Sequence, residues 1–243
     1  LRILGCGRLF RMDNPQYVED GVITYHCPWF SNPEDSFLSS YKRINEVLNL
    51  PRGEDRNTSW RCYIYTSLLK NSLQSRSGTV IECGVERGFN ILVALDFLKQ
   101  TSPALLNNIT ELTLCDTFSG WPEGQESGLE LAHNPVAGRQ PKLIDSPDTF
   151  MSRISEYLPE RKIRILQGIL PDSLNRLKPC LISFLSLDLN YAKPECEIIS
   201  RLYGAILSGS PVLLDDYCYS EIYMQHFLSH SALATQLGYT IIP

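Results

Sequence analysis

The feature that most constrains the fold is a regular alternation of short apolar runs with helix-like stretches, which starts after residue 78. Short apolar runs bounded by turn residues are typical of buried strands, and apolar positions three or four residues apart are typical of helices. Five strand-like runs occur, at residues 79–84, 111–118, 162–168, 181–188 and 210–217. Strands that alternate with helices favour right-handed crossovers. The pattern therefore predicts an α/β fold with a doubly wound, mostly parallel sheet.

Helices are predicted between these runs and before them. The stretch 87–100 follows the first strand, 194–209 carries an apolar stripe that stops at Gly209, and 220–237 is capped by Gly238 and followed by a further strand at 239–243. Before residue 78 the pattern is less regular, with a loop at 26–35 and helices at 36–50 and 60–74. We expect a helical N-terminal cover at 1–77 and a ligand-binding core at 78–243.

Composition narrows the class of protein. The chain carries a net charge of −5 and has no run of five or more Lys and Arg, which argues against a nucleic-acid partner. It contains no apolar stretch that could span a membrane and no persuasive signal peptide, so we expect a cytoplasmic protein that acts on small molecules. The eight cysteines form no CxxC pair and are expected to be reduced and largely buried, rather than joined in disulfides or a zinc site.

Acidic residues end four of the five predicted strands. They are Glu82, Asp116, Asp188 and the pair Asp215 and Asp216. Ligands of open parallel sheets bind outside the carboxyl ends of the strands, so these acidic residues are expected to lie at the ligand site.

The first strand runs into a glycine turn, ECGVERG, that favours a nucleoside ligand. Gly84 permits a tight turn and Gly88 lets backbone approach a ligand at the start of a helix, although simple close packing would also explain both glycines. The turn is not the GxGxxG motif of dinucleotide sites. Asp116 stands where an acid accepts hydrogen bonds from ribose hydroxyls. A nucleoside without phosphates fits best, and S-adenosylmethionine is the obvious candidate.

The acids after the fourth and fifth strands favour a metal ion. Asp188, Asp215 and Asp216 would converge at neighbouring strand ends, where their charges would repel without a cation. Hard oxygen ligands of this kind suit Mg²⁺, Mn²⁺ or Ca²⁺. In the alternative interpretation, Asp188 caps the turn to the next helix and the Asp215 pair forms a solvated turn.

Five motifs, in order, carry a resemblance to a known family: ECGVERG, DTFSGWPE, LQGILPDSL, LDLNYAKPE and LLDDY. Over residues 55–243 the chain resembles the metal-dependent O-methyltransferases of the macrocin, mycinamicin and novobiocin sugar-tailoring family. The resemblance implies a class I methyltransferase (Rossmann-like) fold, S-adenosyl-L-methionine as cofactor and Mg²⁺ or another divalent cation. It also implies a small-molecule acceptor whose hydroxyl is methylated, usually a deoxysugar on a natural product, and leaves a homo-oligomer open.

The resemblance also implies roles for individual residues. Around the cofactor it places Glu82, Gly84, Gly88 and Asn90 at the methionine portion, Asp116 at the ribose hydroxyls, Thr117 and Phe118 beside the nucleoside, and Gly168 and Ile169 by the adenine. It assigns the metal to Asp188, Asp215 and Asp216. The chain reads LDLN where antibiotic-tailoring members read LDGD, and because Asn190 is no base, Asp188 is the preferred catalytic proton acceptor.

Several other features give weaker hypotheses. His226 and His230 share a helix face that could reach substrate or metal but is expected to be solvated. Tyr217 and Tyr219 would line the acceptor pocket or simply pack. The irregular stretch 120–143 is expected to close over the acceptor, with Trp121 and His133 as contacts.

Two other functions compete with methyl transfer. A metal-dependent glycosyltransferase acting on a sugar nucleotide would need basic phosphate contacts, and only Lys193 lies near the metal motif. A non-catalytic cofactor-binding module would have a broken cofactor or metal motif, whereas both are intact here apart from Asn190.

Overall fold

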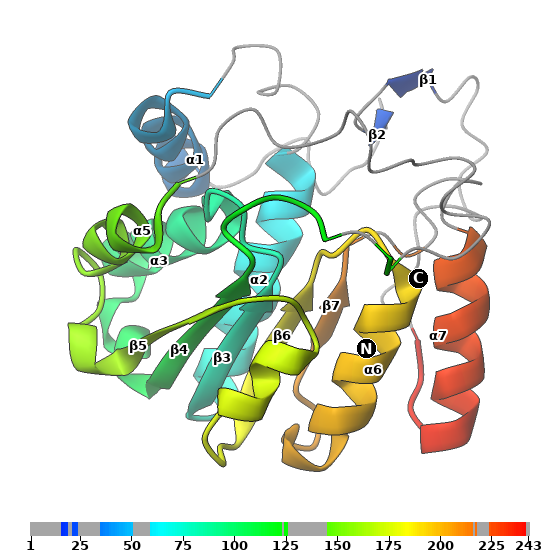
Figure 1. Cartoon of the computed structure of the whole chain (residues 1–243). Coiled ribbons are helices and arrows are strands. Elements are labelled where there is room, and N and C mark those ends of the chain that lie inside the picture. Colours follow the sequence, from blue (N-terminus) through cyan, green and yellow to red (C-terminus); the bar gives the residue numbers. More distant parts are fainter. Residues whose placement is uncertain are drawn as a thin grey trace.

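The centre of the fold is a five-stranded parallel sheet, and its strands all point toward the same edge (Figure 1). The computed structural model describes residues 16–18, 21–23, 35–50, 59–122, 124–125, 145–215, 217 and 224–241. The strands are β3 (Gly78–Cys83), β4 (Ile109–Asp116), β5 (Ile163–Gln167), β6 (Ile182–Leu187) and β7 (Val212–Leu214). Each overlaps one of the predicted runs, so the predicted parallel α/β sheet is confirmed.

The strand order, β5-β4-β3-β6-β7, locates the ligand-binding crevice. The chain builds the sheet outward from β3 to β5 and then returns to place β6 on the other side of β3. In folds of this kind ligands bind at the carboxyl ends of the strands where the order reverses. That point lies between β3 and β6.

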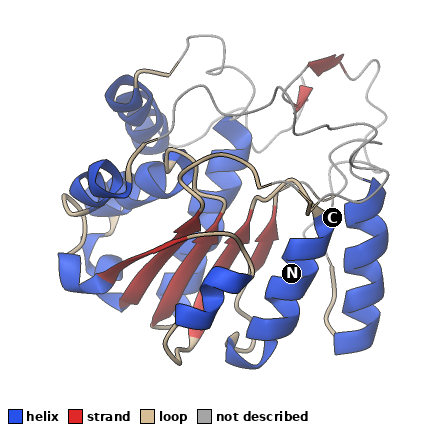
Figure 2. Cartoon of the chain, in the orientation of Figure 1, coloured by secondary structure: helices blue, strands red, loops and turns tan. Residues whose placement is uncertain are grey.

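Helices cover both faces of the sheet (Figure 2). Alternate residues of each strand face opposite sides. Val80 and Phe184 pack in one apolar core, with side chains of α1, α2, α3 and α5. Ile81 and Leu185 pack in a second core, with side chains of α6 and α7. The α-helices are α1 (Asp35–Leu48), α2 (Ser59–Ser75), α3 (Phe89–Thr101), α5 (Pro147–Ile154), α6 (Ala192–Leu202) and α7 (Met224–Leu237).

Short 3₁₀ turns connect several of these elements: η2 (Pro103–Asn108), η3 (Glu160–Lys162), η4 (Asp172–Arg176) and η5 (Tyr203–Ala205). The last of them corrects the prediction of one helix over 194–209. The helix α6 ends at Leu202, because Ile206 bridges to Ile182 of β6 and the Leu207 N–H donates to the Ile182 carbonyl at 2.9 Å. Pairing with the sheet thus replaces the last turns of the predicted helix.

The two chain ends differ in part from expectation. A short antiparallel pair, β1 (Gln16–Val18) and β2 (Gly21–Ile23), lies within the expected helical cover at 1–77, where no strand was predicted. At the other end Gly238, at φ 77°, caps α7 as predicted, and its N–H donates to the Ala234 carbonyl at 2.9 Å. The strand predicted at 239–243 is not formed over residues 239–241, and the last two residues lie outside the described part.

The described residues bear on two expectations from composition, which concern membrane-spanning helices and the state of the cysteines. Among the described residues, no helix combines the length and apolarity needed to cross a membrane. The described cysteines are free thiols, and Cys62, Cys83 and Cys115 are buried. They act as small core side chains, as the sequence indicated.

Candidate active site

Backbone hydrogen bonds align the predicted site residues along the carboxyl edge of the sheet. Four residues that directly follow strands donate their N–H groups to carbonyls at the ends of neighbouring strands. These bonds are Gly168 to Asp116 (2.8 Å), Gly84 to Cys115 (2.9 Å), Asp188 to Cys83 (2.9 Å) and Asp215 to Leu187 (3.0 Å). The structure therefore brings the residues predicted for the nucleoside and those predicted for the metal to one edge.

The glycine turn after β3 is required by close contacts as well as by its conformation. Gly84 has φ 80°, and a Cβ atom there would lie 1.8 Å from the carbonyl oxygen of Asp188. Gly88 has φ 72°, and its Cβ would lie 2.1 Å from the ring of Phe150. Close packing thus accounts for part of the glycine requirement. At Gly84 that packing joins the predicted cofactor turn to the predicted metal loop.

Asp116 fixes the conformation of this turn with its carboxylate. Oδ2 accepts the N–H groups of Val85 at 2.7 Å and Glu86 at 2.9 Å, and Oδ1 accepts the N–H of Phe118 at 2.8 Å. A carboxylate has about four acceptor sites. The Thr117 hydroxyl lies 3.4 Å from Oδ1 as a weak fourth partner, which a ribose hydroxyl would have to replace, so the role in ribose binding stays a prediction.

Glu82 is a buried carboxyl at the end of β3. Its side chain accepts a hydrogen bond from the Tyr65 hydroxyl at 3.0 Å. Burial raises the pKa of Glu82 to about 8; the Tyr65 hydrogen bond opposes the shift, and the charges of Asp188 and Asp116 add to it. At this pKa the carboxyl is mostly protonated at neutral pH.

The other residues predicted around the cofactor differ in how far they are buried and in what they contact. Asn90 is half-buried in the first turn of α3, and Thr117 accepts the N–H of Ser119 at 3.2 Å. Phe118 is buried, with its ring centroid 6.2 Å from that of Phe150. Ile169, directly after Gly168, is 51% exposed and lines a surface hollow with Gln125 and Lys193.

Asp188 and Asp215 follow the adjacent strands β6 and β7, as predicted for a metal site. Asp188 is half-buried. Burial raises the pKa of its carboxyl; the Arg61 guanidinium opposes the shift, and Glu195 and Asp116 add to it. Asp216 lies outside the described residues.

A guanidinium lies among these carboxylates, which the sequence did not indicate. Arg61 of α2 donates its Nε to Asp215 Oδ1 at 3.0 Å, and its Nη2 forms an ion pair with the other oxygen. Part of the repulsion that favoured a metal is therefore balanced by the chain itself.

Asp188 and Asp215 offer the carboxylate oxygens that Mg²⁺ prefers, but Asp215 would have to release Arg61 before both of its oxygens could bind an ion. The alternatives fit less well. Tyr191, not Asp188, is the N-cap of α6, and the Asp215 side chain is only 9% exposed and ion-paired rather than solvated.

The histidine pair on α7 does not face solvent, so that expectation was wrong. His226 and His230 are both fully buried, because α7 packs on α6, where Glu195 faces them. The sequence did not single out Glu195, since its proximity to the pair depends on this packing.

The structure describes only some of the residues in the hypotheses about the acceptor pocket and the closing loop. The Tyr217 ring packs 5.9 Å from Phe227 and 6.3 Å from His230 between centroids. Tyr219, His133 and most of the stretch 120–143 lie outside the described residues, so the predicted closing loop stays a prediction.

Comparison with known proteins identifies the family. Residues 67–237, more than half of the chain, match the family model described as macrocin O-methyltransferase (TylF). The chain belongs to this family. As a macrocin O-methyltransferase family member it is an enzyme of the O-methyltransferase class, which decides against the glycosyltransferase and the non-catalytic module. No curated protein sequence matches the chain.

Solved structures agree on the fold. The O-methyltransferase NovP superposes with a TM-score of 0.64 at 19% identity, covering 82% of this chain and 91% of NovP. CalS11, a calicheamicin methyltransferase, superposes with a TM-score of 0.56 at 13% identity, covering 93% and 90%. At these identities the likeness shows the fold alone, which is the class I methyltransferase fold that the sequence predicted.

Proposed function

We propose that this macrocin O-methyltransferase family member uses S-adenosylmethionine and Mg²⁺ to methylate a hydroxyl of a sugar or a glycosylated natural product. One observation carries the proposal. The turn backbone at Gly84 packs on the Asp188 carbonyl, so a nucleoside held by Glu82 and Asp116 and an ion held by Asp188 and Asp215 would be neighbours. Methyl transfer needs this adjacency, because the acceptor oxygen must lie behind the sulfonium methyl.

The chain's own residues would divide the chemistry between them. Asp116 would receive a ribose hydroxyl, and Glu82 would face the ammonium of the methionine portion. Bound Mg²⁺ would orient the acceptor oxygen and lower its pKa. Asp188 would accept the hydroxyl proton while the new C–O bond forms and the C–S bond breaks, releasing S-adenosylhomocysteine. A carboxylate within hydrogen-bond reach of the acceptor hydroxyl would act as a general base in this way.

The sugar acceptor is supported by relatives. The family model is named for macrocin, and a further structure of CalS11, described as a TDP-rhamnose 3'-O-methyltransferase, superposes with a TM-score of 0.51 at 13% identity, covering 86% of this chain and 87% of CalS11. Both names describe methyl transfer in natural-product chemistry. A cytoplasmic location and the division at residue 77 remain part of the proposal.

A calorimetric titration tests the proposed function. S-adenosylhomocysteine is titrated into the protein with Mg²⁺ and again with a chelator, and sugar hydroxyls are then screened with S-adenosylmethionine. We expect cofactor binding in the micromolar range and methyl transfer that the chelator abolishes. Absence of cofactor binding under both conditions would overturn the proposal.

Cofactor binding near pH 7 is expected to release a proton from Glu82. The carboxyl, with a pKa of about 8, is mostly protonated in the free protein. The cofactor ammonium would favour the ionised form, so the pKa falls on binding and affinity rises with pH up to about 8. Calorimetry in two buffers of different ionisation enthalpy measures the release, which should approach about one proton per cofactor. Glu82→Gln should abolish it, and unchanged release in that variant would contradict the assignment.

A further inference from the structure

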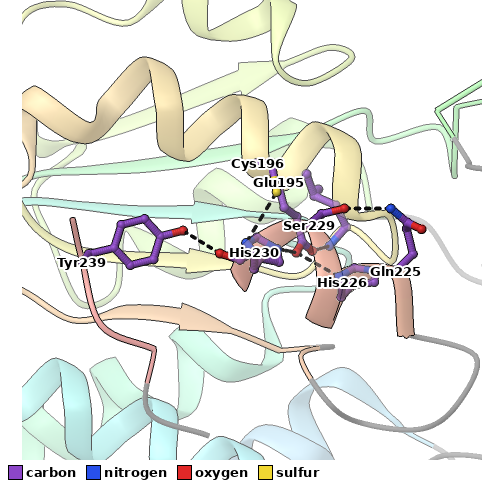
Figure 3. Close-up of polar contacts among 8 residues, drawn as sticks. Glu195, Cys196, Gln225, His226, Ser229, His230 and Tyr239 are labelled. Atoms are coloured by element: carbon purple, nitrogen blue, oxygen red, sulfur yellow. Dashed lines mark hydrogen bonds and ion pairs between the residues drawn. The ribbon is translucent and has the colours of Figure 1, made fainter. Parts of the chain in front are cut away.

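A buried cluster of two histidines and one glutamate lies between α6 and α7, next to the loop that carries Asp188 (Figure 3). Glu195 comes from α6 and both His226 and His230 from α7, and all three side chains are fully buried. His226 Nδ1 lies 3.2 Å and His230 Nε2 3.0 Å from the same oxygen, Glu195 Oε2. Two imidazole nitrogens therefore converge on one carboxylate oxygen.

The fold holds each part of this cluster in place. The spacing of four residues puts both imidazoles on one face of α7, in the arrangement by which helices bind metal ions through histidine pairs. The second carboxylate oxygen of Glu195 accepts the Leu189 N–H at 3.1 Å. His230 Nδ1 faces Cys196 Sγ at 3.7 Å. Contacts of this kind on the outer atoms orient the ligands of metal sites.

The donor chemistry favours a transition-metal ion over Mg²⁺. Two imidazoles and one carboxylate are ligands of Zn²⁺ and its neighbours, whereas Mg²⁺ prefers oxygen alone. Bonds of about 2.0 Å in a tetrahedral site place ligand atoms about 3.3 Å apart. The two nitrogen–oxygen separations already approach that value, and all three ligand atoms lie within 4.8 Å of one another.

We propose that Glu195, His226 and His230 form a second metal site, which binds one Zn²⁺ ion. The ion would fasten α7 to α6. Through the Leu189 N–H held by Glu195, it would also steady the loop that carries Asp188. Its role would be structural, because all three ligand side chains are fully buried.

Zinc binding by the full chain tests the proposal. The protein is first stripped with a chelator, then titrated with Zn²⁺ in competition with a coloured chelator, with excess Mg²⁺ present throughout. We expect one zinc per chain that Mg²⁺ does not displace. Glu195→Gln and His230→Gln should each weaken it by about tenfold or more. The controls are His26→Gln, a histidine remote in sequence, and Asp188→Asn, which removes a predicted ligand of the other metal; both should retain zinc.

X-ray absorption at the zinc edge of the wild-type protein gives an answer even where variants fail to fold. A spectrum that shows two imidazole ligands and oxygen around the zinc, without sulfur, would support the site. A sulfur shell would show that cysteines bind the ion and would overturn the proposal. Three other results would also overturn the proposal. The protein would fail to bind one equivalent of zinc, the Glu195→Gln and His230→Gln variants would retain it, or the Asp188→Asn variant would lose it. The cluster would then be a hydrogen-bonded ion pair only.

Discussion

Replacing Asp188 by asparagine is expected to lower kcat for methyl transfer by about 10²–10⁴-fold, the range of a lost proton acceptor. The substitution keeps the shape of the side chain but removes the charge that would hold the metal and receive the hydroxyl proton. Affinity for S-adenosylhomocysteine should change little, because the predicted nucleoside contacts follow β3, β4 and β5 rather than β6. Steady-state rates at saturating Mg²⁺ and calorimetry with S-adenosylhomocysteine measure the two quantities.

Asp172→Asn is the matched control for this experiment. Its carboxylate is 81% exposed and lies 3.8 Å from the Arg201 guanidinium, a weak surface pair. The control should keep wild-type kcat. An Asp188→Asn enzyme with a rate within threefold of wild type would show that another group accepts the proton.

Gly84→Ala is expected to lower the free energy of unfolding by about 3 kcal/mol or more. The new Cβ would lie 1.8 Å from the Asp188 carbonyl oxygen, a backbone atom tied to β3, and the φ of 80° is unfavourable for alanine. Relief of the overlap would push the β6 loop away from the turn, so cofactor affinity should fall as well. Urea denaturation measures the stability.

Two other glycines separate the causes of this effect. At Gly238 φ is 77° and a Cβ would meet nothing within 4 Å, so alanine there should cost only the backbone strain of about 1–2 kcal/mol. Gly204 has neither a positive φ nor a close neighbour, and alanine should change stability by less than about 0.5 kcal/mol. Equal losses at positions 84 and 238 would show that the contact with Asp188 does not constrain the turn.

The sequence predicts the sheet and its acidic edge because both follow from local patterns. Short apolar runs identify the strands, and in a parallel sheet the residues after them must meet at one edge. Glu82, Asp116 and Asp188 are found there for that reason. The end of α6 was missed, because Ile206 leaves the helix to pair with a strand that begins 24 residues earlier, at Ile182.

Arg61 and Glu195 could not be recognised from local pattern. Arg61 is separated from Asp215 by 154 residues, and no periodicity shows that α2 carries a guanidinium to the end of β7. Glu195 and His230 are 35 residues apart on two helices whose contact depends on how both cover the sheet. Charge balance between distant segments is set by tertiary packing, and a single sequence contains no local signal for it.

The two strands that flank the crevice are expected to be the part of the fold best protected from local opening. β3 and β6 are each paired on both sides and buried along their whole length. Segments of this kind open only when the whole domain unfolds, whereas peripheral elements open locally and more often. Glu82 and Asp188 therefore lie at the carboxyl ends of the two strands that should open least often. Substitutions in peripheral elements should therefore disturb Glu82 and Asp188, the proposed cofactor-binding and proton-accepting groups, less than substitutions in β3 or β6.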